Sequence, residues 1–352
     1  ADEREQVETA LATLERAYQR GTGGDASAQI NNGLLFSMGY GPSYFERFDE
    51  PLPDSVDLPP AAETLRELDA DPAIADDYDA ALHFGSDHPE IVLAVEEALF
   101  GGLDSLNGVP VEATFEGVFE RAERRAGVIG RGMPHEKLDS DSIPERSPLS
   151  MGFKSAFKDA LPREAKITIQ EGPFAGGTTQ HFSRLEIDLE TWYGEDHESR
   201  VHRMFGPSYS EEDVGEIGDS LGGESRITKD QTDNVEADAR ERGIVGHTQK
   251  TARARDEDFD PLILRRGELL YPSEDTAVLN FGALQQGIDD FVETRKAMQS
   301  VRYHGDGEEP AGDPPEVEEA NHGILHYFEV TSRANFLVPR RADRALPTPT
   351  PE

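Results

Sequence analysis

The sequence predicts an α+β protein built from two similar halves. One arrangement occurs four times along the chain: a short apolar strand, a turn marked by glycine or polar residues, and then an amphipathic helix. The strands are expected at 34–38, 80–84, 181–187 and 277–281. Two strand-helix units in each half indicate a duplicated α+β domain with antiparallel sheets.

Each unit follows from its own residue pattern. The strand at 181–187 alternates polar and apolar residues, as a half-buried strand does. The segment after 80–84 contains Ser86 and Asp87, either of which is expected to cap a helix that Pro89 starts. The last strand leads into apolar residues at helical spacing, namely Leu284, Ile288, Phe291, Val292 and Met298.

Composition shifts along the chain predict its domain organisation. Residues 1–32 combine a polar helix with a glycine-rich stretch and are expected to form a peripheral N-terminal arm. A segment rich in Pro, Ser and Asp, from about 133 to 148, separates a predicted N-terminal domain at 33–140 from a C-terminal domain at 149–345. The stretch 305–315 is expected to be an exposed loop and 346–352 a Pro/Thr-rich tail, and neither is expected to carry chemistry.

The charge pattern argues against two classes of partner. The 352 residues include 71 Asp and Glu against 34 Lys and Arg, which gives a formal charge of -37 spread over the whole chain. Nucleic acid and anionic membranes are therefore not expected to bind. Only seven of the basic residues are lysines. An acidic, lysine-poor surface is typical of halophilic proteins, because molar salt shortens the Debye length to about 3 Å and so screens the repulsion between the acids.

Other features bear on the compartment and the chemistry. There is no cysteine, so disulfides and thiolate chemistry are absent. No apolar run approaches the roughly 18 residues of a membrane span. The first residue is Ala1 rather than Met, which is compatible with a removed export signal.

One histidine and one arginine stand out as candidate site residues. His247 lies 18 residues before Arg265, the first of two arginines that follow the apolar residues 262–264. A neutral imidazole is a common axial ligand of haem iron, and a fixed guanidinium stabilises charge growing on a peroxide oxygen. The alternative is a solvated loop histidine and two surface arginines.

The sequence around these residues resembles that of the dye-decolorising (Dyp-type) peroxidase family. Within that family the chain resembles a haloarchaeal-like member. The matching segments are His247 with Leu264-Arg265-Arg266-Gly267, GYGPSYF at 39–45, FAGG at 174–177, VLNF at 278–281 with Gln285, and NFLVP at 335–339. The resemblance covers about residues 33–340. It implies two ferredoxin-like domains whose antiparallel sheets face each other, and haem b in the C-terminal half, held by His247 as the iron ligand.

The resemblance is weakest at the acid that moves a proton between the two oxygens of hydrogen peroxide. The family has Gly-Phe-x-Asp-Gly, whereas this chain has Gly152-Phe153-Lys154-Ser155 and, further on, Phe157-Lys158-Asp159-Ala160. One register places Asp159 in the acid's position and the other places Ser155 there. Asp159 is preferred, because it lies 17 residues before Gly176 and Pro162 follows it closely; a surface acid is the alternative.

The resemblance also implies roles for four further residues. Arg203 matches an arginine near a haem propionate, and Arg184 follows the Gly176-Gly177 turn. Phe281 is expected to line the distal side of the haem, and Asp289 to hydrogen-bond the imidazole of the iron ligand. Surface charges, core packing and a solvated helix acid are the respective alternatives.

Two other groups suggest chemistry less strongly. His83, Asp87 and His88 have the composition of a metal site, but helix capping explains them better. Trp192 and Tyr193 could pass electrons from a bulky donor, although an aromatic pair at a helix start is more often packing.

The predicted function is therefore that of a haem-b peroxidase in which Asp159 and Arg265 act on hydrogen peroxide and a phenol or dye supplies electrons. The alternatives are a haem-binding or electron-transfer protein with little peroxidase activity, and a cofactor-free structural module. The resemblance further implies a homo-oligomer, exported through the twin-arginine route to the cell surface or medium, with the cytoplasm as second choice.

Overall fold

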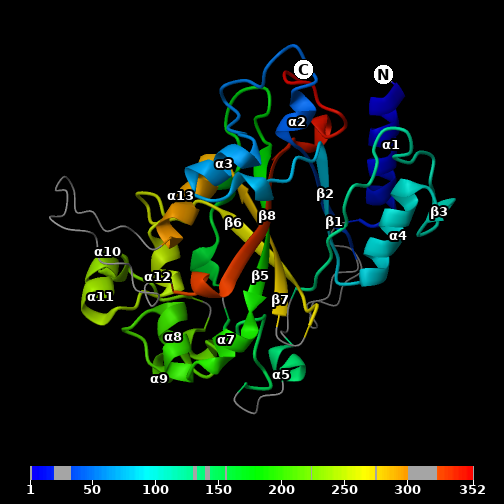
Figure 1. The fold of residues 1–352 in the computed structure, drawn as a ribbon. Coiled ribbons are helices and arrows are strands. Elements are labelled where there is room, and N and C mark those ends of the chain that lie inside the picture. Colours follow the sequence, from blue (N-terminus) through cyan, green and yellow to red (C-terminus); the bar gives the residue numbers. More distant parts are fainter. Residues whose placement is uncertain are drawn as a thin grey trace.

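The computed structural model describes residues 2–19, 33–129, 133–138, 143–154, 157–222, 224–273, 276–299 and 323–351. Its centre is one antiparallel sheet with the strand order β2-β1-β8-β5-β7-β6, accompanied by a two-stranded sheet of β3 and β4. Figure 1 shows helices on both sides of the large sheet. The predicted α+β class with antiparallel strands is confirmed.

The strands of the large sheet are β1 Leu35–Tyr40, β2 Ala80–Gly85, β5 Thr178–Asp188, β6 Leu264–Leu270, β7 Thr276–Gln285 and β8 Phe328–Val338. The small sheet consists of β3 Ser105–Leu106 and β4 Val109–Pro110.

The longer helices are α1 Asp2–Ala17, α3 Ala61–Glu67, α4 Pro89–Phe100, α7 Leu189–Gly194, α8 His197–Phe205, α11 Val235–Arg242, α12 His247–Ala252 and α13 Ile288–Met298. The shorter helices are α2 Pro42–Phe45, α5 Pro134–Lys137, α6 Glu164–Ile167, α9 Glu211–Val214 and α10 Lys229–Asp233.

Strand β5 is the centre of the large sheet. It pairs with β7 from Thr179 to Asp188 and with β8 from Thr178 to Ile187. β1 joins β8 through the single pair Tyr40–Leu337, so the strands of the two predicted halves form one continuous sheet rather than two sheets that face each other. The domain boundaries predicted from composition stay a prediction.

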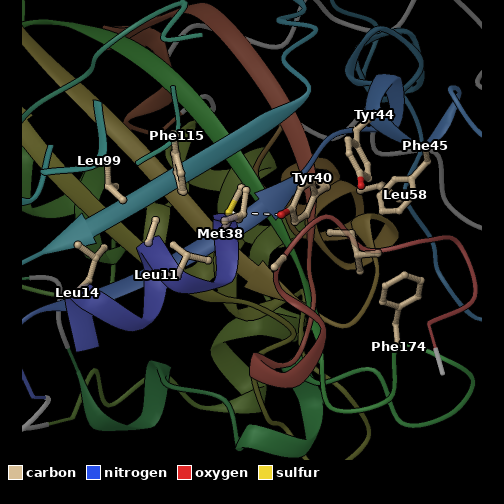
Figure 2. Packing of buried hydrophobic residues seen from close by; sticks show 14 of the residues in the cluster. Leu11, Leu14, Met38, Tyr40, Tyr44, Phe45, Leu58, Leu99, Phe115 and Phe174 are labelled. Carbon is tan, nitrogen blue, oxygen red and sulfur yellow. Dashed lines mark hydrogen bonds between the residues drawn. The ribbon is translucent and has the colours of Figure 1, made fainter. Parts of the chain in front are cut away.

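Different helices cover the two sides of this sheet. Helix α13 contacts β5 and β7, α12 contacts α13, and α3 contacts β8. On the other side of the molecule, α1 and α4 pack near β1 and β2 (Figure 1). The residues of α1 and α4 share one large hydrophobic core with strand residues of both halves (Figure 2), including Leu11, Leu14, Met38, Tyr40, Leu99 and Leu337.

The four predicted strand-helix units are all present, but Leu284, which was expected in the last helix, lies in β7, and that helix begins at Ile288. Pro89 begins α4 as expected, but His88 occupies the cap position and makes no capping bond through its side chain. The Ser86 hydroxyl instead accepts a hydrogen bond from the backbone N–H of His88. The glycine-rich stretch after α1 and the segment 305–315 lie outside the described residues.

The prediction that the N-terminal helix is peripheral is wrong, and the C-terminal tail is also packed against the molecule. Val7, Leu11 and Leu14 of α1 are at most 1% exposed, because this helix is amphipathic and buries its apolar face in the core. Tyr44 donates a hydrogen bond to the carbonyl of Pro347, which holds the tail against the molecule.

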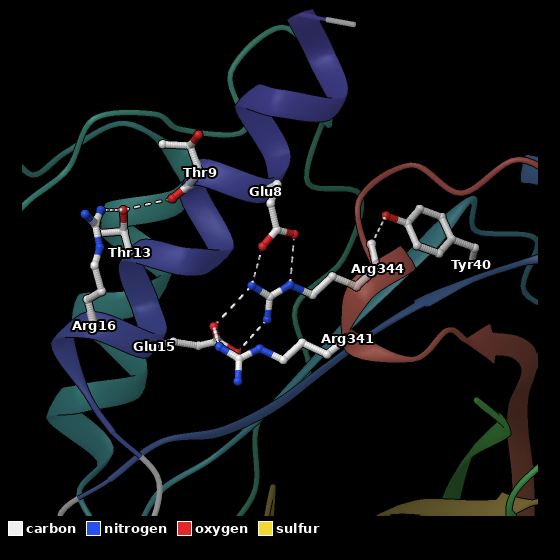
Figure 3. A network of polar contacts seen from close by, with 8 residues as sticks. All are labelled: Glu8, Thr9, Thr13, Glu15, Arg16, Tyr40, Arg341 and Arg344. Carbon is white, nitrogen blue, oxygen red and sulfur yellow. Dashed lines mark hydrogen bonds and ion pairs between the residues drawn. The ribbon is translucent and has the colours of Figure 1, made fainter. Parts of the chain in front are cut away.

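Ion pairs between Arg344 and α1 join the two ends of the chain (Figure 3). The Arg344 guanidinium donates to Glu8 at 2.8 and 3.1 Å and to Glu15 at 2.6 and 3.2 Å, and only 7% of its side chain is exposed. The Tyr40 hydroxyl donates to the carbonyl of Arg344 at 2.6 Å and accepts from the N–H of Leu346 at 2.9 Å. Multiple charge-assisted hydrogen bonds on a buried guanidinium are worth more than an exposed ion pair.

Replacing Arg344 is therefore expected to destabilise the protein measurably. Arg344→Ala should lower the free energy of unfolding by about 2 kcal/mol, because among the described residues Glu8 loses its partner and Glu15 keeps only the exposed Arg341. Arg16→Ala is the control, since the Arg16–Glu112 pair is more than half exposed and should change stability by less than about 0.5 kcal/mol. Urea unfolding followed by circular dichroism measures both, and equal effects of the two substitutions would contradict the assignment.

Candidate functional site

The site lies on the face of the sheet that α13 covers, and strand register decides which side chains reach it. Arg265, Ala283, His181 and Asn335 form one row of paired residues across β6, β7, β5 and β8. Gly267, Phe281, Ser183 and Arg333 form the row two residues further along, on the same face. Phe291 of α13 stacks on the His181 ring at 3.6 Å between centroids, which places the helix over these rows.

His247 is the first residue of α12, and the local sequence fixes its position. The Gln249 side chain accepts a hydrogen bond from the N–H of Gly246 at 2.9 Å and so caps the helix. A Cβ at Gly246 would lie 2.2 Å from the backbone nitrogen of Gly206, so only glycine lets α12 approach the end of α8 this closely. The start of α12 is therefore rigidly placed.

The His247 ring is neutral and faces positive charge. Burial lowers its pKa to about 3, and Arg265, Lys250 and Arg295 lower it further in that order. Among the described residues, none forms a hydrogen bond with either of its ring nitrogens. His247 thus offers a neutral nitrogen donor, and the predicted pair of His247 and Arg265 does lie within electrostatic reach in the structure.

Arg265 carries its charge without an acidic partner in the described part of the chain. Burial lowers the pKa of its guanidinium, with a second contribution from the nearby charge of Arg255. Because an arginine stays protonated at neutral pH, its N–H groups are available to an anion. The site therefore favours negatively charged groups beside Arg265.

Two further arginines, which the sequence analysis did not select, add to this charge. Arg333 is 3% exposed, and among the described residues its buried Nε and Nη1 atoms have no hydrogen-bond partner, nor does Nη1 of Arg295. Burial lowers their pKa values to about 9 and about 10. Arg295 had a detectable signal, because it lies on the apolar stripe of α13, four residues after the buried Phe291.

Lys250 on α12 was also missed. It is 1% exposed, and burial lowers the pKa of its ammonium group to about 7, with smaller contributions from Arg253 and Arg295. Its position three residues after His247 places a fourth basic group in the same region, after Arg265, Arg295 and Arg333.

Asp159 does not contact Arg265. It lies in the short 3-10 helix Lys158–Ala160 and accepts hydrogen bonds from Ser225, at 3.0 Å from the backbone and 2.5 Å from the hydroxyl. Its charge acts on Arg255, and Arg255 in turn acts on Arg265. Asp159 therefore acts on Arg255 rather than directly on Arg265, as its predicted role would require. The alternative, Ser155, lies outside the described residues.

Three other predicted residues are engaged elsewhere. Arg203 donates to Glu195 at 2.9 Å, although its Nη1 is buried without a partner. Arg184 donates to Glu186 at 2.9 Å and Thr331 at 3.1 Å. Acids that are close in space but not predictable as partners from the sequence thus bind both arginines.

The structure does not bring Asp289 to His247. Asp289 is exposed in the first turn of α13, where its N–H donates to Asp57 at 2.7 Å. Arg295, more than one turn further along the same helix, is the α13 residue whose charge acts on His247. Phe281, by contrast, lies in the row next to that of Arg265 on the same face, where an apolar ring would line a bound ligand.

The weaker candidates have structural explanations. His83 pairs with Glu268 at 3.2 Å and His88 with Glu90 at 3.3 Å, and neither belongs to a metal-like cluster of described residues. Trp192 is fully buried and donates to the carbonyl of Met151 at 3.0 Å, while Tyr193 donates to that of Ser150 at 2.8 Å. Both aromatic residues pack in the core.

A large cleft lies away from His247. It has a volume of about 2250 Å³, and residues that alternate with those of the site line it, including Phe182, Arg266 and Glu268. Neither His247 nor Arg265 lines this cleft. The cleft and the cationic site thus lie on opposite faces of the sheet.

Taken together, the residues suit an anionic ligand with an apolar body and a metal that accepts an imidazole nitrogen. His247 supplies a neutral nitrogen ligand, the rings of Phe281 and Phe291 supply apolar surface, and the buried N–H groups of Arg295 and Arg333 have no partner among the described residues. A porphyrin that carries iron and carboxylates meets these requirements. No helix among the described residues is long and apolar enough to span a lipid bilayer.

Comparison with known proteins gives a family and a fold. The model of a family of unknown function, DUF7405, matches residues 1–340. No protein among those with curated descriptions matches the chain.

Solved structures similar to this chain include a dye-decolorizing protein from V. cholerae, with a TM-score of 0.55, 12% identity and coverage of 97% of this chain and 90% of that one. A putative dyp-type peroxidase from Shewanella oneidensis has a TM-score of 0.54, 16% identity and coverage of 96% and 88%. A DypB variant from Rhodococcus jostii RHA1 in complex with heme has a TM-score of 0.56, 12% identity and coverage of 97% and 89%. At this identity the likeness shows the fold.

The buried histidine of the site predicts a pH dependence of stability. Burial lowers the pKa of His181 to about 3, against 6.5 for an ordinary histidine, so the unfolded chain binds a proton first as the pH falls. The stability that neutral His181 contributes is present above about pH 6.5 and is lost toward pH 3, by about 1.4 kcal/mol per pH unit.

Because many acids titrate in the same pH range, the contribution of His181 is measured as the difference between the wild type and a His181 variant. His181→Gln should flatten the fall in unfolding free energy between pH 6.5 and 4, whereas His88→Gln, at the surface, should leave it as in the wild type. A wild-type slope in the His181 variant would show that His181 is not buried in its neutral form.

Proposed function

The chain belongs to DUF7405, a family of unknown function, and we propose that it is a haem-b peroxidase that reduces hydrogen peroxide and oxidises phenolic or dye-like one-electron donors. The observation that carries the proposal is the neutral His247 ring, which has no hydrogen-bond partner among the described residues and lies within electrostatic reach of Arg265. The shared fold with Dyp-type peroxidases supports it, as does the heme in one of those structures.

The chain's own residues divide the work. A bound haem would supply the iron at which peroxide is cleaved and electrons are taken up. His247 would hold the iron, and burial keeps its imidazole unprotonated for that purpose. Arg265 would bind the negative charge that develops on peroxide oxygen, because its guanidinium has no acidic partner in the described part of the chain. Phe281 would exclude water from the space beside Arg265.

The candidate proton acceptor is arranged differently here from the Gly-Phe-x-Asp-Gly pattern of Dyp-type peroxidases. Asp159 keeps the carboxylate, but Ser225 holds it, and Arg255 lies between it and Arg265 in the chain of electrostatic contacts. Asp159 acts on peroxide only if it releases Ser225 or works through water.

This geometry favours one alternative, a haem-binding or electron-transfer protein with little peroxidase activity. Its specific support is that no carboxylate among the described residues contacts Arg265, so proton transfer would be slow. The natural donor, homo-oligomer formation, salt adaptation and export stay predictions from the sequence.

The iron ligand can be tested directly. Hemin added to the full-length protein in concentrated salt should give a sharp Soret band at one equivalent, and His247→Ala should lose or shift this band because the iron loses its nitrogen ligand. His88→Ala, a surface histidine, is the matched control. A wild-type protein that stays without a Soret band, or a band unchanged in His247→Ala, would rule out the proposed ligation.

The roles of Arg265 and Asp159 can be separated by rapid mixing of the hemin-loaded protein with peroxide. Arg265→Leu should slow peroxide cleavage by about 100-fold or more, because a charge-stabilising donor is lost. Arg266→Leu, on the opposite face of the sheet, should not slow it.

Asp159→Asn decides between the two functions. A loss of about 100-fold would make Asp159 the proton acceptor of a peroxidase. An unchanged rate would remove it from the mechanism, and a wild type that is itself slow would favour the electron-transfer alternative.

A further inference from the structure

Two buried arginines of the site, Arg333 on β8 and Arg295 on α13, have N–H groups that no atom of the described residues accepts. Within that part of the chain, Nε and Nη1 of Arg333 are buried without a partner, and so is Nη1 of Arg295. Phe291 connects them: the Arg333 guanidinium lies 5.5 Å from the centre of its ring, and Arg295 follows it by one turn on the same helix face. The two cations are close enough for Arg295 to lower the pKa of Arg333.

The groups around Arg333 are neutral and already satisfied. His181 donates through Nδ1 to Asn335 at 2.7 Å and accepts through Nε2 from Ser183 at 2.7 Å. The assignment of these roles follows from Asn335, whose amide nitrogen donates to Thr64 and to the carbonyl of Pro59 and so turns its oxygen toward His181. None of these side chains can compensate the charge of Arg333.

Leaving this charge unpaired is costly. A guanidinium stays protonated at neutral pH even with the lowered pKa of Arg333, so it cannot escape the cost by losing its proton. Removing an ion from water costs several kcal/mol unless an opposite charge accepts its hydrogen bonds. Within the described residues no acid contacts Arg333 or Arg295.

We propose that Arg333 and Arg295 form a buried carboxylate-binding pair, whose ligand presents its carboxylate from an apolar body. A carboxylate matches the parallel N–H groups of a guanidinium, and the stacked rings of His181 and Phe291 beside it favour an apolar body over a small hydrated ion. The carboxylate can come from a side chain of the proposed porphyrin, in which case the inference rests on the proposed function, or from a free organic acid.

The test uses the full-length protein freed of any bound chromophore, at constant ionic strength, with two pairs of probes. Hemin is compared with hemin dimethyl ester, whose carboxylates are blocked, and benzoate with benzamide. The variants are Arg333→Gln and Arg333→Lys, with Arg266→Gln on the opposite face of the sheet as control. Fluorescence quenching gives the affinity for the porphyrins, and the midpoint of thermal unfolding reports binding of the small probes.

If a porphyrin is the source, the wild type and Arg266→Gln should bind hemin at least tenfold more tightly than its ester. Arg333→Gln should lose this preference, and Arg333→Lys should keep part of it. If a free acid is the source, benzoate but not benzamide should raise the unfolding midpoint of the wild type, and Arg333→Gln should not respond.

Equal binding of both members of each pair by the wild type would overturn the inference, as would a preference that Arg333→Gln retains. Arg295→Gln repeats the test if Arg333→Gln does not fold. A wild type that binds neither hemin nor its ester would refute the proposed function, and the benzoate pair would still decide whether the two arginines bind a carboxylate.

Discussion

The pairing of β5 with β7 on one edge and β8 on the other sets the place of every group in the site. Successive side chains of a strand point to opposite faces, so this register puts Arg265, His181 and Arg333 under α13 and leaves Arg266 and Phe182 in the large cleft. A slip of one residue would exchange the two sets. The apolar core that α13 shares with the sheet holds the register, and the site depends on it.

The second organising feature is the separation of charge between surface and interior. The chain carries a formal charge of -37, yet Arg333 on β8 and Arg295 on α13 are buried close together without an acid in contact with either among the described residues. Acids at the surface are screened by salt over about 10 Å or less and compensate buried cations poorly. An internal anion is the group that balances them.

The sequence alone was sufficient to predict the strand-helix units and to select part of the candidate site. Period-two and helical patterns located all four strand-helix units, and the spacing of His247 and Arg265 identified two residues that lie within electrostatic reach. It was not sufficient for Arg333, whose importance depends on α13 and β8 meeting in space. Likewise, only the fold pairs Arg203 with Glu195, or shows that the face of α1 is buried.

The cationic surroundings of His247 also bear on how a proton could leave bound peroxide. Positive charge favours the anionic form of any acid beside it, so Arg265 would lower the pKa of a peroxide held there. A peroxide acidified in this way needs a weaker or more distant acceptor than one in a neutral pocket. Under the proposed function, the charges of Arg265 and Arg255 would therefore do part of the work of a closer carboxylate, and Asp159, whose charge acts on Arg255, would be the more distant acceptor.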